Sequence, residues 1–224
     1  MSKKVVDLLG SAIVTLKTFM AKHSKKKKRA LNWHKIIDIF AYSLITLGLL
    51  FIYLTFGPAV KQEVKYEVGK TIPHEFDATP PNTQFSVVIP KIEAKAPVFS
   101  NVDPYNKDAY LPVLQKGVAH AAGTALPDRP GNTYLFAHST DAFYNVGRYN
   151  AIFYLLGKLE QGDEVQVYFE DSKYKYEVQE VKVVPADAVE YLQGVSDEKV
   201  LTLQTCYPPG TTLKRLVVIA KQIE

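Results

Sequence analysis

Residues 200–206 read VLTLQTC, and after a Pro-Pro-Gly turn residues 214–219 read KRLVVI. Both stretches are rich in leucine and β-branched residues, which favours two neighbouring strands joined by the turn. Side chains alternate between the two faces of a strand, so the first stretch has one face of Leu201, Leu203 and Thr205 and an opposite face of Val200, Thr202, Gln204 and Cys206.

An antiparallel pairing of these strands brings the end of the first beside the start of the second. Cys206 and Arg215 are therefore expected to stand together at one rim of the sheet. A guanidinium stabilises a neighbouring thiolate, which is the nucleophilic form of cysteine, and it can also stabilise an oxyanion during acyl transfer. Without further context, a lone cysteine at a strand end is more often a small buried hydrophobic side chain.

Other short segments follow the same strand-like pattern and are separated by turns rich in glycine, proline and aspartate. Short helices are predicted at residues 106–115, 142–150 and 187–193. The sequence from about residue 84 to residue 224 is therefore predicted to be mainly β, a closed or nearly closed barrel with few helices. The further predicted strands are residues 84–90, 132–138, 163–169 and 173–184.

The composition of the chain excludes several classes of protein. A chain of 224 residues with 47% hydrophobic residues suits one globular domain and an appendage, and excludes a wholly disordered chain. Cys206 is the single cysteine, which excludes an intramolecular disulfide framework and a cysteine-rich zinc module. The net charge is +4, but residues 1–35 carry +9 and the remainder carries −5.

The stretch after this basic tail, residues 39–56, contains eighteen residues without a charge. With its flanks it is long enough to cross a bilayer, and the upstream KKKKR at residues 25–29 favours a cytoplasmic N-terminus. We predict a basic cytoplasmic tail (1–35), a transmembrane helix (36–56), an extracytoplasmic stalk (57–83) and a catalytic β-barrel (84–224). The alternatives are a buried soluble helix and a nucleic-acid or nuclear-targeting role for KKKKR.

Three motifs in order resemble the sortases, a family of membrane-anchored cysteine transpeptidases. TLQTC at residues 202–206 resembles their Thr-Leu-x-Thr-Cys signature, Arg215 in LKRLVV resembles their downstream arginine, and residues 117–140 (GVAHAAGTALPDRPGNTYLFAHST) resemble the segment that ends in their catalytic histidine. The resemblance covers about residues 85–223. It implies a sortase-like closed barrel behind a membrane anchor.

Carried over to this chain, the resemblance makes Cys206 the nucleophile, His138 the general acid and Arg215 the clamp for oxyanion and substrate. Thr205 matches a position that helps to hold the substrate or oxyanion. The family often has glycine before the histidine, whereas this chain has Ala137. His120 also lies in a segment that often carries histidine in sortases, and we interpret it as a hydrogen-bonded structural residue.

The resemblance also implies the reaction. An LPxTG-like sorting motif binds extended, Cys206 forms a thioester with it, and an amine of a cell-wall precursor or a pilin lysine resolves the thioester. The expected partners are surface proteins that bear the motif, the amine acceptor and the lipid bilayer around residues 36–56, with no nucleic acid, metal or other cofactor. Asp103-Pro104-Tyr105 resembles the Asp-Pro-aromatic lid of pilin-building sortases but follows the first strand, so we interpret it as a turn.

Alternatives from other classes stay open at this point. One is a non-enzymatic, membrane-anchored β-domain in which Cys206 is inert. Another is a different cysteine hydrolase or peptidase of the cell envelope, although an L,D-transpeptidase would need a Cys-Arg-Gly signature where this chain has Cys-Tyr-Pro. Acidic residues at 160, 163 and 164 and at 170 and 171 could be imagined as a calcium site, but solvated turns explain them better.

Overall fold

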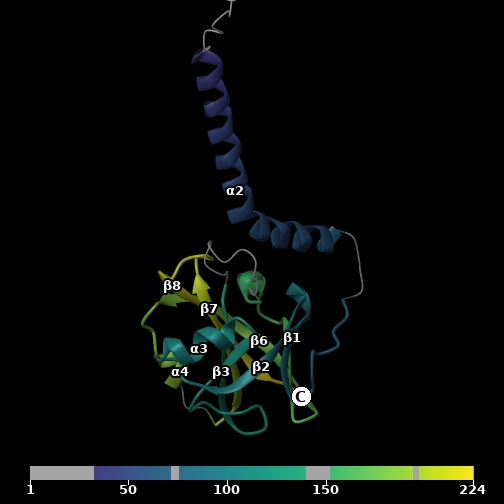
Figure 1. Ribbon diagram of the computed structural model, residues 1–224. Coiled ribbons are helices and arrows are strands. Elements are labelled where there is room, and N and C mark those ends of the chain that lie inside the picture. The colour runs from purple at the N-terminus through teal and green to yellow at the C-terminus, as the bar shows by residue number, and fades with distance from the viewer. Residues whose placement is uncertain (1–32, 72–75, 140–151, 194–196, 224) are drawn as a thin grey trace, which may run out of the picture. The chain divides into compact units, whose positions relative to one another are not determined.

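The computed structural model describes residues 33–71, 76–139, 152–193 and 197–223 (Figure 1). Residues 1–32 of the expected basic tail, His74 and the helix expected at residues 142–150 lie outside the described residues. Within them the element order is one long helix followed by strands and short helices. The prediction of a mainly β fold behind an apolar helix is confirmed.

Helix α2 (Trp33–Thr71) contains the apolar stretch. Its first 22 residues, Trp33–Leu54, are long and apolar enough to cross a membrane and are not buried against other parts of the chain. The helix continues to Thr71, so the first part of the segment expected to be a stalk is helical. Alanine, glutamine, glutamate and lysine are frequent after residue 58, and these good helix formers explain the continuation.

The strands close into a barrel in the order β1-β2-β3-β4-β7-β8-β6-β5. Most neighbours are antiparallel, whereas β2 pairs with β3 and β4 pairs with β7 in parallel. The strands are β1 (Phe85–Ile89), β2 (Ala94–Val102), β3 (Val118–Ala121), β4 (Gly131–Phe136), β5 (Glu164–Phe169), β6 (Ser172–Pro185), β7 (Lys199–Tyr207) and β8 (Lys214–Gln222). Between them lie η1 (Pro90–Ile92), α3 (Lys107–Leu114), η2 (Tyr154–Lys158) and α4 (Glu190–Gln193).

The sequence analysis did not predict two of the strands, β2 and β3. Lysine, alanine and proline in the first half of β2 (AKAPVFSNV) are poor strand formers, and β3 (VAHA) has only four residues. Both strands form because they pair with neighbours: β2 lies antiparallel to β1 and parallel to β3. The expected turn at Asp103 is present, and its Oδ1 accepts the backbone N–H of Tyr105 at 2.9 Å.

Side chains of alternate residues build two apolar layers. The larger cluster fills the barrel and includes Leu135 of β4, Leu203 of β7 and Val218 of β8. The smaller cluster lies on the outer face of β3 and β4, where α3 and α4 cover it (Figure 1). Tyr110 of α3 meets Phe136 edge-on there, with ring centroids 6.0 Å apart. The outer face of β4 is therefore partly covered, which limits where a ligand can approach it.

His120 of β3 ties three backbone segments together and is 3% exposed. Its Nδ1 accepts the backbone N–H of Asn101 at 3.3 Å, and its Nε2 lies 3.0 Å from the carbonyl oxygen of Ala125 and 2.9 Å from Oγ1 of Thr124. A carbonyl oxygen can only accept, so Nε2 carries the hydrogen and the imidazole is neutral. These contacts agree with a structural role. Burial lowers the pKa of His120, although the bond to Ala125 opposes the shift.

This lowered pKa predicts a pH-dependent stability. Above the usual histidine pKa of about 6.5 the imidazole is neutral in both states, whereas below it the unfolded chain binds a proton that the folded chain resists. The free energy of unfolding should therefore fall as the pH drops below about 6.5. In His120→Gln the stability should be lower by about 1–3 kcal/mol at pH 8, from buried groups left unpaired, and the decline toward pH 5 should be shallower. Denaturant titrations at several pH values measure both effects, and an equally steep decline in the variant would contradict the assignment.

Candidate active site

The parallel pairing of β4 and β7 aligns the end of one strand with the end of the other. Residues 131–136 pair with residues 199–204, from Gly131 opposite Lys199 to Phe136 opposite Gln204. The alignment continues one residue further, because the N–H of Ala137 donates to the carbonyl oxygen of Gln204 at 3.2 Å. Continuing this register places His138 beside Cys206, at the spacing of about 5 Å that separates neighbouring strands.

The antiparallel pairing of β7 and β8 places the arginine on the other side of the cysteine. Cys206 lies opposite Arg215, as the sequence analysis predicted, and the hairpin turn between them includes Gly210 at φ +80°. Cys206 and Arg215 thus pair across two neighbouring strands, and His138 follows the end of the third strand, β4, by two residues. Cys206 is a free, half-buried cysteine.

Thr205, expected to help to hold the substrate or oxyanion, is a buried residue with a hydrogen bond to the neighbouring segment. Its side chain lies on the opposite face of β7 from that of Cys206, is 2% exposed, and donates its hydroxyl hydrogen to the carbonyl oxygen of Ala137 at 2.9 Å. This bond joins the residue before the cysteine to the residue before the histidine. The geometry therefore favours holding the two strand ends in register over direct contact with a substrate.

The guanidinium of Arg215 is oriented by its own turn. Its Nη1 donates to the carbonyl oxygens of Thr212 at 3.2 Å and Lys214 at 3.0 Å. These bonds use one nitrogen of a group that has five N–H donors in a planar fork, so the orientation of the whole fork is restricted. A restricted fork on the residue that pairs with Cys206 suits the stabilisation of a negatively charged oxygen.

The backbone of His138 is also held. Its carbonyl oxygen accepts the N–H of Phe153 at 3.4 Å, and Phe153 is fully buried in the barrel core. The side chain of His138 is half-buried. A half-buried imidazole at a strand end keeps access to solvent and to an approaching peptide, as a proton donor requires.

Two further side chains lie on the face of β4 and β7 that carries the cysteine, and the sequence analysis did not identify them. The hydroxyl of Tyr134 donates to Oε1 of Gln204. Burial raises the pKa of Tyr134, whereas the positive charge of Arg215 acts in the opposite direction. The alternation in NTYLFAH places Tyr134 on the same face as His138, and this was the available signal.

The carboxylates of the two acidic turns bond to donors of the chain itself. Nζ of Lys91 lies 2.7 Å from Oε2 of Glu160 and 2.8 Å from Oδ2 of Asp163. At the second turn, the hydroxyl of Thr83 donates to Oδ1 of Asp171. The part of the chain that the structure describes contains no group of three or more histidine, cysteine, aspartate or glutamate side chains placed to hold a metal.

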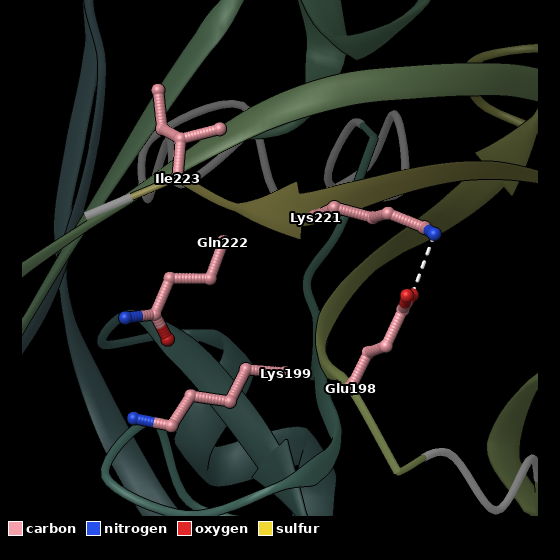
Figure 2. Close-up of a pocket in the computed structure, with 5 residues that line it drawn as sticks. All are labelled: Glu198, Lys199, Lys221, Gln222 and Ile223. Atoms are coloured by element: carbon pink, nitrogen blue, oxygen red, sulfur yellow. Dashed lines mark ion pairs between the residues drawn. The ribbon is translucent and has the colours of Figure 1, made fainter.

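A pocket at the opposite end of the same two strands is distinct from this site. It is lined by the first residue of β7, the last residues of β8 and their neighbours, and Figure 2 shows the ion pair between Lys221 and Glu198 at its edge, at 2.5 Å. Its lining contains no cysteine or histidine. The residues that line it are Glu198, Lys199, Lys221, Gln222 and Ile223.

Known proteins share this fold. The chain is 28% identical over 138 residues to Sortase D of Bacillus subtilis (strain 168), a match that covers 60% of this chain and 61% of that protein, less than two thirds of its length. Sortase A from Corynebacterium diphtheriae has a similar structure, with 25% identity and a TM-score of 0.53 over 66% of this chain and 63% of that one. Sortase C1 from Streptococcus suis has 28% identity and a TM-score of 0.53, with coverage of 72% and 80%. Residues 87–223 match the Sortase domain, so the chain belongs to the sortase family.

Proposed function

We propose that this sortase is a cysteine transpeptidase that cleaves an LPxTG-like sorting motif of surface proteins and joins the acyl part to an amine. The observation that supports the proposal is the register of β4, β7 and β8: Cys206 pairs with Arg215, and the backbone bond from Ala137 to Gln204 lies one residue before His138. A nucleophile, a proton donor and an oxyanion stabiliser are the three groups that acyl transfer through a thiol requires.

The proposed reaction has two halves. Sγ of Cys206, as thiolate, attacks the carbonyl carbon before the last residue of the motif, and Arg215 stabilises the negative oxygen of the tetrahedral intermediate. The C–N bond then breaks while His138 gives a proton to the leaving amine, and a thioester remains. In the second half the acceptor amine attacks the thioester, His138 takes up its proton, and the thiolate leaves as the new amide forms. Thr205 acts by holding the strand ends in place.

The proposed setting is the outer face of a membrane. Residues 36–56 anchor the protein, the basic tail of residues 1–35 stays in the cytoplasm, and residues 57–83 connect the anchor to the catalytic barrel of residues 84–224. The apolar helix supports this arrangement by its length and composition. The proposed acceptors are a cell-wall precursor, for anchoring, or a lysine of another protein, for polymerisation.

The topology is tested by proteolysis of intact cells. Because positive charge precedes the apolar helix, the barrel should lie outside the cell and a protease added to intact cells should remove it. Immunoblots against tags at both ends follow the two parts. A barrel that is cleaved only after the membrane is permeabilised would contradict the proposed orientation.

The role of His138 is tested by comparison with the buried histidine. His138→Ala should lower the rate of transpeptidation by about 10²–10⁴, the usual contribution of a general acid, with an unchanged melting temperature. His120→Ala should chiefly lower the melting temperature, since its contacts are structural. Peptide ligation followed by mass spectrometry, together with thermal unfolding, measures both effects. Equal losses of rate at unchanged melting temperature would overturn the assignment.

The role of Arg215 is tested by a substitution that keeps the charge. Lysine lacks the planar fork, so Arg215→Lys should lower turnover by about 10²–10³ if directed donors stabilise the oxyanion. The alkylation rate of Cys206 by iodoacetamide should change little. Arg129→Lys is the matched control, because Arg129 is an exposed turn residue paired with Asp128. If turnover and alkylation fall together in Arg215→Lys, the arginine acts mainly on the thiol.

A further inference from the structure

A buried tyrosine orients a glutamine beside the proposed nucleophile. Tyr134 is 3% exposed, and its ring packs in the outer apolar cluster beneath α3 and α4. Its hydroxyl donates to Oε1 of Gln204. A buried phenol needs a hydrogen-bond partner, and Gln204 provides it. Burial raises the pKa of this phenol, so Tyr134 keeps its proton and remains the donor at physiological pH.

This bond decides which end of the amide faces away from the tyrosine. The oxygen of Gln204 is turned toward Tyr134, so the nitrogen, with its two N–H donors, points to the other side of the Cγ–Cδ axis, within the amide plane. Gln204 is half-buried and therefore reachable from outside the barrel. The pair consequently presents hydrogen-bond donors, at a fixed orientation, on the face of β7 that carries Cys206.

The spacing matches an extended peptide. Gln204 and Cys206 are two residues apart on one strand, so their side chains emerge from the same face about 7 Å apart. An extended peptide repeats over the same distance, and its backbone carbonyls are acceptors. A peptide that lies along this face with its scissile carbonyl at Cys206 therefore has a further acceptor near Gln204.

We propose that Gln204 binds the acyl-donor peptide through its side-chain amide, which donates to a carbonyl oxygen about two residues from the scissile bond. Tyr134 is a positioning residue that acts through Gln204. The inference rests on the proposed function. It adds a binding residue at Gln204, which is the variable position x of the Thr-Leu-x-Thr-Cys signature. Arg215 and Gln204 then contact different oxygens of the same peptide, so their contributions are separable.

The test uses the full-length protein in detergent micelles with a fluorescence-quenched LPxTG-type peptide and a glycine-based amine. Gln204→Met keeps the length of the side chain but removes the donors, and KM should rise about 5- to 10-fold while kcat changes less than twofold, the pattern for loss of uniform binding. Tyr134→Phe should raise KM less. The double variant should resemble Gln204→Met alone, because the tyrosine acts only through the amide.

The chain provides a matched control on the other side of the barrel. The hydroxyl of Tyr168 donates to Oε1 of Gln166 at 3.2 Å on β5, which is separated from β7 by β8 and β6. Tyr168→Phe and Gln166→Met should leave KM and kcat unchanged. The alkylation rate of Cys206 should be the same in all variants, which shows that the site itself is intact.

The outcomes separate the two proposals. An unchanged KM in Gln204→Met would overturn the role of Gln204, and so would additive effects of the two substitutions on KM. In either case the proposed function still stands if the wild-type protein is active. If Gln204→Met fails to fold, Gln204→Glu keeps the acceptor for Tyr134 without N–H donors, and an unchanged KM there would overturn the inference equally. Wild-type protein that is alkylated at Cys206 yet cleaves no peptide would overturn the proposed function and the inference with it.

Discussion

The parallel pairing of β4 with β7 is the constraint on which the site depends. The two strands are 68 positions apart in register, and the intervening chain must leave the barrel end, build β5 and β6, and return before β7 can form. Parallel neighbours require such a crossover, because a tight turn can only join antiparallel strands. The same pairing fixes the end of β4 against the end of β7, and His138 and Cys206 both follow from that alignment.

The two faces of strand β7 have different roles: one packs in the barrel core and the other carries Cys206. Leu201, Leu203 and Thr205 point inward, where the leucines fill the barrel core and the threonine hydroxyl joins Ala137. Gln204 and Cys206 point outward. Since a shift of one residue would exchange the faces, burial of the leucines fixes which residues face outward. The packing of the leucines therefore both stabilises the barrel and determines the face on which the thiol lies.

The outer face of β4 adds a second layer that shapes the site. Helices α3 and α4 cover the apolar side chains next to Tyr134 and leave its hydroxyl directed at Gln204. A tyrosine ring thus contributes apolar packing at one end and a hydrogen bond at the other. This arrangement connects the packing of α3, which lies far from the cysteine in sequence, with the orientation of a side chain two residues from it.

The sequence by itself determined the apolar helix, most strands of the barrel and the pairing of Cys206 with Arg215, because these depend on local periodicity and on a hairpin joined by a short turn. It also pointed to His138 through resemblance. Only the tertiary structure decided that β2 and β3 are strands, that Thr205 faces Ala137, and that Tyr134 holds Gln204. These features arise from contacts between residues far apart in the chain, such as the 70 positions between Tyr134 and Gln204. Local propensity carries no information about partners that only the closure of the barrel brings together.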